Sequence, residues 1–401
     1  MYLAKFAAVG VVGALVLGAC SNSTTTPAAG GSSSSSAAAG SSSAVDTGAT
    51  YKIGFQGPLS GDNQQLGINE VNAVELAVNQ ANESGSLPFK LELVKSDDVG
   101  LPDKAPAAAA TLLQDPAVVG VVGPSFSGAT KAVGATYSEA QLALLSPSAT
   151  NATLTTSGWT AFHRIVPTDA VEAKGAAAWL ATKAKKVYVI DDLSDYGKGV
   201  ADDLQKALEG ASIAVTREGV DAKTTDYSAI AQKVVSSGAE AMFYGGYDAQ
   251  ASLFAKALKS AGYTGITMTG NGGKSSVFTE GAGDAGNGWY FSCGCLDATT
   301  WPAAKDFETA YVAAYGTPSS TYSPEGYDAA NAMIEAIKTA AAGGGEVTRA
   351  AVLDAVNKLD YKGITTQVKF TPEGEVENAT INLYKQEDGV IKLLGPVQDQ
   401  K

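Results

Sequence analysis

The chain has 401 residues, with 28 Lys and Arg against 41 Asp and Glu, and a formal net charge of −13. Hydrophobic residues make up 45% and charged residues 17%, which is typical of a globular protein and excludes a wholly disordered chain. The acidic balance argues against nucleic acid as a partner, because phosphate binding needs a basic surface. A single histidine, His163, and three cysteines argue against His-based catalysis, a metal cluster or a disulfide scaffold.

The N-terminus has the pattern of a secretory signal. Lys5 precedes a short apolar run over residues 6–17, and residues 17–20 read Leu-Gly-Ala-Cys. This ending resembles the bacterial lipobox, in which the cysteine becomes the lipid-carrying N-terminus. We predict a signal peptide over residues 1–19 and lipidation at Cys20; the alternative is a plain signal peptide with a chance cysteine.

A low-complexity segment follows Cys20. Residues 21–50 are nearly all Ser, Thr, Ala and Gly, with almost no large apolar side chains. Such a segment cannot bury enough surface to offset the entropy of ordering it. We predict a flexible tether over residues 20–50 that holds a soluble body away from a membrane.

From residue 51 the first half of the chain alternates between strand and helix patterns. Residues 118–122 form a continuous apolar run, as expected for a strand buried on both faces. The helix at 67–82 has valines on one face. The predicted strands here are 51–55, 89–94, 118–122 and 142–145, and the predicted helices are 67–82 and 103–114.

The second half repeats this alternation, which predicts parallel sheets covered by helices. About 350 residues of such a pattern exceed what one sheet usually holds, so we expect two α/β lobes. The predicted strands are 187–190, 213–215, 241–244, 266–268, 367–370, 379–384 and 390–393, and the predicted helices are 197–208, 227–236, 248–261, 303–315, 324–341 and 348–359.

Two polar loops follow neighbouring predicted strands. Residues 123–130 come after the strand at 118–122, and residues 146–151 come after the strand at 142–145. Parallel sheets bind ligands at the carboxyl ends of their strands, where loops enter helices. Both loops offer hydroxyls and backbone N–H groups to an anion, although ordinary helix capping by Ser or Thr is the alternative.

Motifs for catalysis are incomplete. Residues 123–127 nearly match the nucleophile elbow G-x-S-x-G, but Ser127 stands in place of the last glycine. Residues 273–275 read Gly-Lys-Ser, as at the end of a P-loop, but Met268 stands where the first glycine is required. No motif supports a nucleophile–base pair, so we predict that the protein is not an enzyme and carries no cofactor or metal.

Cys293 and Cys295 are separated by a single residue. In an oxidising exterior, two thiols this close could form a tight disulfide; two free thiols are the alternative. The spacing differs from that of thioredoxin-type redox motifs.

The body of the chain resembles the branched-chain amino acid-binding proteins, the leucine/isoleucine/valine-type solute-binding components of bacterial ABC transporters. The likeness covers residues 51–394 and rests on segments in family order. These segments are 53–61, 122–130, 146–151, 162–169, 196–199, 226–228 and 244–247.

The resemblance implies a type I periplasmic-binding-protein fold, with two α/β lobes joined by three hinge crossovers and closing on a ligand. It places the crossovers near residues 166–169, 293–297 and 367–371. Each lobe is then discontinuous in sequence. Lobe 1 would comprise residues 51–168 plus 297–368, and lobe 2 residues 169–296 plus 369–398.

The resemblance also implies the roles of site residues. The ligand's α-carboxylate would be held by Ser127 and by the loop containing Ser148, Ala149 and Thr150. Its α-ammonium would be held by an acidic residue after the strand at 266–268, with help from Tyr247. Leu66 stands where the family often has an aromatic residue, and Tyr196 and Tyr322 are further candidates for the pocket wall.

The sequence departs from the family at the ammonium site, where Asn271 stands in place of the acid. An amide oxygen accepts a hydrogen bond but supplies no charge, and a buried unpaired ammonium is costly. Asp248, Asp169 or a shifted loop could compensate; otherwise the ligand is an amide, urea or aromatic carboxylate. We expect Asn271→Asp to strengthen binding of a cationic amine.

These features together predict a lipid-anchored, extracytoplasmic, monomeric binding protein. It would capture a small polar ligand, a branched-chain or related amino acid above all, and deliver it to the permease of an ABC importer. The alternative partner is a signalling receptor, with the same protein acting as a ligand sensor.

Overall fold

The computed structural model describes residues 48–344, 346–377 and 380–400. The predicted signal peptide, Cys20 and the predicted tether up to residue 47 lie outside these residues. Strand β1 begins at Thr50, the last residue of the predicted tether. None of the helices in the described part of the chain combines the length and apolar character needed to cross a membrane.

The first sheet has five strands in the order β2-β1-β3-β4-β5, and all neighbouring pairs are parallel. This is the arrangement predicted for buried apolar strands linked by helices. The strands are β1 Thr50–Gly57, β2 Lys90–Asp97, β3 Val118–Val122, β4 Ala143–Ser146 and β5 Phe162–Arg164.

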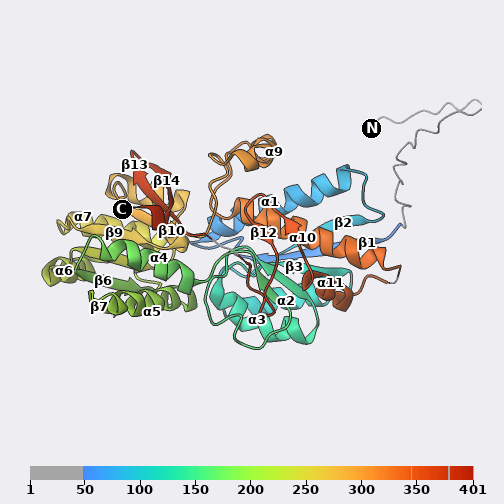
Figure 1. The fold of residues 1–401 in the computed structure, drawn as a ribbon, viewed down its shortest axis with the longest axis horizontal. Helices are drawn as coiled ribbons and strands as arrows, with labels where there is room; N and C mark the ends of the chain where they lie inside the picture. The colour runs from blue at the N-terminus through green and yellow to red at the C-terminus, as the bar shows by residue number, and fades with distance from the viewer. Residues whose placement is uncertain (1–47, 345, 378–379, 401) are drawn as a thin grey trace, which may run out of the picture. The chain divides into compact units, whose positions relative to one another are not determined.

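Helices cover both faces of the first sheet. Side chains of β3 divide between two cores, with Val119 and Val122 in one and Val118 and Val121 in the other. The first core is closed by α1 (Gln64–Glu83), α10 (Ser323–Ala342) and α11 (Arg349–Val356), and Figure 1 shows α1 beside α10. The second core is closed by α2 (Ala105–Leu113) and α3 (Ser127–Glu139).

The second sheet has seven strands in the order β14-β13-β10-β9-β8-β6-β7. The pairs from β10 to β7 are parallel, whereas β13 pairs antiparallel with both β10 and β14. The strands are β6 Lys186–Asp191, β7 Ala214–Gly219, β8 Ala241–Gly245, β9 Ile266–Thr269, β10 Tyr290–Cys293, β13 Asn382–Glu387 and β14 Val390–Pro396.

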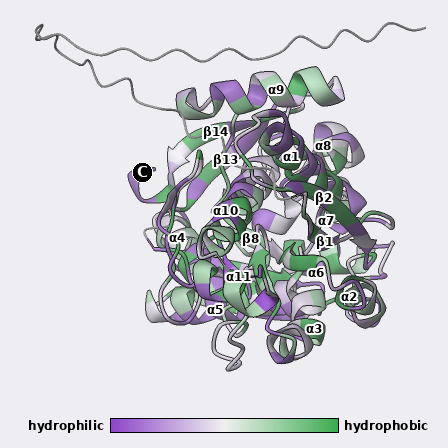
Figure 2. Ribbon diagram, turned by 90° about the vertical axis from the view of Figure 1, so that its right-hand side faces the viewer, coloured by the Kyte–Doolittle hydropathy of each residue, from purple (hydrophilic) through white to green (hydrophobic). Residues whose placement is uncertain are grey.

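This sheet is also covered on both faces. Val187 and Val189 of β6 pack with α4 (Asp169–Ala181) and α5 (Asp195–Gly210), whereas Tyr188 and Ile190 pack with α6 (Ser228–Ser237), α7 (Asp248–Ser260) and α8 (Ser276–Ala282). Helices with one buried side carry alternating hydrophilic and hydrophobic bands, as Figure 2 shows.

The chain passes between elements of the two sheets three times. It does so between β5 and α4, between β10 and α10, and between the small hairpin β11–β12 and β13. The predicted fold class, α/β with two parallel sheets, is confirmed; the residue limits of the two lobes stay a prediction. The remaining elements are β11 Tyr361–Lys362, β12 Gln367–Val368, α9 Lys305–Tyr315, η1 Asn271–Gly273, η2 Gly283–Ala285, η3 Pro302–Ala304 and η4 Val397–Asp399.

Some elements were not predicted. Strands β5 and β10 are only three and four residues long, and helix α8 only seven, too short for a periodic pattern to stand out. Helix α4 is rich in alanine and shows no sharp division into apolar and polar faces. The strand predicted at 367–370 ends at Val368, and the strand predicted at 379–384 is β13, which begins at Asn382.

Candidate ligand-binding site

A small cavity lies at the carboxyl ends of strands from both sheets. Parallel α/β sheets bind ligands at this edge. Seven of the nine predicted ligand-binding residues line it. The full lining comprises Leu66, Ser125, Phe126, Ser127, Ser148, Tyr196, Tyr247, Asn271, Gly272 and Tyr322.

The serines of the first sheet lie where β3 and β4 end. Ser127 is the first residue of α3, is buried, and its hydroxyl accepts a hydrogen bond from the Asn151 N–H at 3.2 Å. Its own hydroxyl proton therefore remains to be donated. The Ser148 hydroxyl donates to the Ser125 carbonyl at 2.7 Å. Ser127 is thus better suited than Ser148 to donate to a ligand.

Ala149 and Thr150 do not line the cavity, contrary to the sequence-based expectation. The Ala149 N–H donates to the Ser146 hydroxyl at 3.0 Å, so it is already used. The Thr150 carbonyl accepts from the Asp169 N–H at 2.8 Å, which joins the loop to the start of α4. The Thr150 side-chain oxygen is buried and makes no hydrogen bond with any of the described residues.

Arg164 fixes the loop that carries these residues. Its side chain is fully buried and donates to the carbonyls of Ala149 at 3.0 Å and Asn151 at 2.8 Å. The same guanidinium donates to both carboxylate oxygens of Glu375, at 2.8 and 2.5 Å. A bidentate pair of this kind sets position as well as charge, so the geometry of residues 149–151 depends on it.

Aromatic side chains form much of the remaining wall. Tyr247 stacks on Phe126 with ring centroids 4.3 Å apart, so that a residue preceding α7 contacts one preceding α3. The Tyr196 hydroxyl accepts from the Gly272 N–H at 3.0 Å, and the buried Tyr322 hydroxyl has no hydrogen-bond partner among the described residues. The wall is therefore largely apolar, with a few hydroxyls, as in many small-molecule sites.

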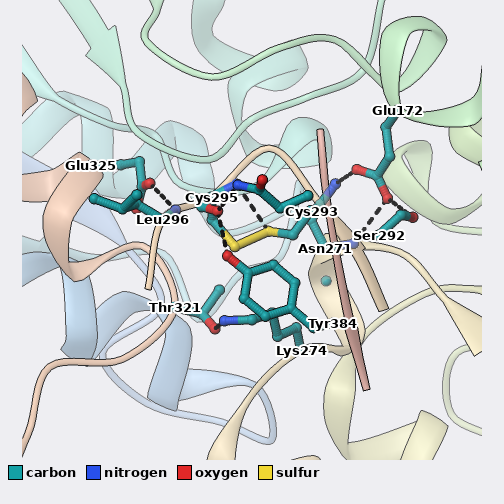
Figure 3. The surroundings of a disulfide bond; sticks show 12 residues. Glu172, Asn271, Lys274, Ser292, Cys293, Cys295, Leu296, Thr321, Glu325 and Tyr384 are labelled. Atoms are coloured by element: carbon teal, nitrogen blue, oxygen red, sulfur yellow. Dashed lines mark hydrogen bonds between the residues drawn. A yellow bond between two sulfur atoms is a disulfide. The ribbon is translucent and has the colours of Figure 1, made fainter. Parts of the chain in front are cut away.

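Asn271 is held by a carboxylate that the sequence analysis missed. Glu172 of α4 accepts from the Asn271 N–H at 3.2 Å, from the Asn271 side-chain amide, and from the Ser292 hydroxyl at 2.7 Å (Figure 3). Burial raises the pKa of Glu172 to about 7. An aspartate at position 271 would face this carboxylate. We therefore now expect Asn271→Asp alone to weaken binding of a cationic amine, whereas the sequence led us to expect stronger binding.

The two acids named from the sequence as possible substitutes differ in their surroundings. Asp248 is buried and accepts from the Ser275 hydroxyl, so it is already engaged. Both carboxylate oxygens of Asp169 are buried and make no hydrogen bond with the described residues. Burial, and after it the nearby Glu172, raise the pKa of Asp169.

Polar contacts also join the two sheets' loops beside the cavity. The Asn151 side-chain amide donates to the Asp195 carbonyl at 2.6 Å, and Lys131 forms an ion pair with the Asp195 carboxylate at 2.6 Å. Asp195 begins α5, on the second sheet. These contacts join the two sides of the cavity.

Cys293 and Cys295 form a disulfide where the chain leaves β10 (Figure 3). The Tyr384 hydroxyl donates to the Cys295 carbonyl at 2.7 Å, and Glu325 accepts from the following N–H, that of Leu296, at 2.7 Å. Within the described residues, no group of three or more His, Cys, Asp or Glu side chains is arranged to hold a metal ion.

Glu70 lies behind the cavity and gives a pH prediction. It is fully buried and accepts from the Ser125 hydroxyl at 2.6 Å, and burial raises its pKa to about 8 from an ordinary 4.5. Between these values the folded protein holds a proton that the unfolded chain releases, so stability falls as the pH rises through this window. In urea unfolding from pH 5 to 8, the free energy of unfolding should fall less steeply with pH for Glu70→Gln than for the wild type. Equal slopes of this free energy against pH would contradict the raised pKa of Glu70.

Two parallel sheets with a cavity at their facing strand ends define a periplasmic-binding-type solute-binding fold. Residues 50–389 match the family model described as periplasmic binding protein, and the chain belongs to this family. It is a family of extracytoplasmic solute-binding proteins rather than an enzyme class.

Among its relatives, the chain is 30% identical to Leu/Ile/Val-binding protein homolog 3 of Brucella melitensis, over 86% of this chain and 93% of that protein. It is 28% identical to the leucine-, isoleucine-, valine-, threonine- and alanine-binding protein of Pseudomonas aeruginosa, over 84% of this chain and 90% of that protein. The crystal structure of the branched-chain amino acid transporter substrate-binding protein LivJ from Streptococcus pneumoniae, in complex with isoleucine, has a TM-score of 0.77 at 26% identity, covering 86% of this chain and all of that one.

Proposed function

We propose that this protein captures a small amino acid, branched-chain or closely related, and delivers it to the permease of an ABC importer. The observation that carries the proposal is the cavity, with the Ser127 hydroxyl on one side and Tyr196, Tyr247 and Asn271 on the other. The relatives named for binding leucine, isoleucine and valine support the same ligand class.

In this proposal the ligand's carboxylate meets the start of α3. Ser127 donates its hydroxyl proton, and the helix N-terminus favours the negative charge. An aliphatic side chain would then contact Leu66 and Phe126, which are both buried and apolar.

Anchoring and delivery belong to the proposal as well. Lipidation at Cys20 would hold the protein at the outer face of the membrane, and residues up to 50 would serve as its tether. Ligand contacts with both sheets would favour the closed arrangement of the two lobes, and the permease would bind this closed form. We expect a monomer with one ligand per chain.

Asn271 also favours a second candidate, a small carboxylate that lacks an ammonium group, such as an aromatic acid. A thermal-shift screen separates the two, because a ligand that binds the folded state raises the melting temperature. We expect leucine, isoleucine or valine to raise it, with calorimetry giving one site per chain. A rise with benzoate or amides, and with none of the amino acids, would reject the amino acid ligand and select the second candidate.

A further inference from the structure

We propose that Glu172 supplies the negative charge for the ligand's ammonium group and that Asn271 and Ser292 hold its carboxylate in position. The ligand class would then be α-amino acids rather than neutral amides or simple carboxylates. This inference rests on the proposed function and adds to it a residue outside the motif that carries the family resemblance.

Three hydrogen bonds fix the Glu172 carboxylate from the cavity side. Ser292 and the Asn271 backbone donate to Oε1, and the Asn271 side chain donates to Oε2 (Figure 3). Asn271 itself lines the cavity. The amide at this position therefore orients a carboxyl group that comes from another element, helix α4.

Glu172 lies close enough to act on the cavity. A Cβ atom built on Gly270 would lie 2.7 Å from Glu172 Oε1 and 2.7 Å from the Tyr196 hydroxyl oxygen. Both oxygens therefore lie beside Gly270. Burial, and after it the nearby Glu172, raise the pKa values of Tyr196 and Tyr322, which both line the cavity. The carboxylate thus lies just behind this part of the wall.

The charge of Glu172 is not balanced by the protein nearby. None of the described residues that line the cavity is Lys, Arg or His. Within the described part of the chain, no cationic side chain acts on Glu172, whereas Arg164 is bound to Glu375. A buried carboxylate without a cation is unfavourable, and a ligand ammonium would relieve that cost.

The test is calorimetry of L-leucine and of 4-methylpentanoate, which is leucine without its amino group. The proteins are the wild type, Glu172→Gln, Asn271→Asp and the double variant, with Asp169→Asn as a matched removal of a neighbouring buried carboxyl group. The melting temperature of each ligand-free variant shows whether it is folded.

We expect Glu172→Gln to weaken leucine binding at least tenfold and to leave the affinity for 4-methylpentanoate unchanged. Asn271→Asp should also weaken leucine binding, because two carboxylates would then face each other. The double variant restores one charge and should bind leucine better than either single variant.

Several results would overturn the assignment. One is a folded Glu172→Gln protein that binds leucine with the affinity of the wild type. Another is an equal loss of affinity for leucine and 4-methylpentanoate in that variant. The third is that only Asp169→Asn loses the preference for leucine over 4-methylpentanoate. Failure of the wild type to bind any α-amino acid would instead reject the proposed function.

Discussion

Replacing Glu375 with alanine is expected to lower the free energy of unfolding by about 3–5 kcal/mol, the cost of leaving a buried charge without its partner. The Arg164 side chain is 0% exposed and Glu375 is its bidentate carboxylate partner. Without Glu375 the guanidinium keeps its bonds to backbone carbonyls but loses its countercharge. The loop at 149–151 should loosen as well, which would weaken ligand binding.

Urea unfolding of the ligand-free protein measures this effect, and Glu377→Ala is its matched control. Glu377 pairs with Lys369 at 3.7 Å, and both side chains are well exposed. Exposed pairs of this kind contribute at most about 1 kcal/mol. A Glu375→Ala protein no less stable than Glu377→Ala would show that the buried pair does not hold the loop.

The second large effect is expected for Ser127→Ala. The Ser127 hydroxyl lines the cavity and would donate to the charged carboxylate of the ligand, and such a bond contributes about 1.5–3 kcal/mol. Its loss should weaken leucine binding by about 10- to 100-fold. The change removes no large side chain, so the ligand-free fold should persist.

Ser148→Ala is the control for this comparison. The Ser148 hydroxyl already donates to the Ser125 carbonyl, so its removal should change stability slightly and leucine affinity far less than Ser127→Ala does. Calorimetry of both variants and the wild type under one condition provides the comparison. Equal affinity losses in Ser148→Ala and Ser127→Ala would argue against direct contact of Ser127 with the ligand.

Much of the fold could be predicted because its strands are buried on both faces. The apolar run Val118–Val122 is a strand with the predicted bounds, and the helix pattern at 248–261 corresponds to α7. Shorter elements escaped prediction, since three or four residues such as those of β5 and β10 carry no periodic signal. The antiparallel pairing of β13 depends on contacts distant in sequence, which a local pattern does not contain.

The residues of the candidate site could be predicted where they belong to a loop that directly follows a predicted strand. Ser127 and Ser148 belong to such loops, and both line the cavity. Glu172 was missed because α4 was missed, although Asp169 and Glu172 stand three apart, a spacing that places two acids on one helix face. Ala149 was predicted to bind, but its N–H is used within the loop, which only the three-dimensional contacts show.

The most direct test of the account is a crystal structure of the protein with the amino acid that raises its melting temperature most. We expect the ligand to occupy the cavity, with its carboxylate hydrogen-bonded to Ser127 and its ammonium facing the side formed by Asn271 and Glu172. A ligand bound outside the cavity, or one with its carboxylate turned away from Ser127, would contradict it.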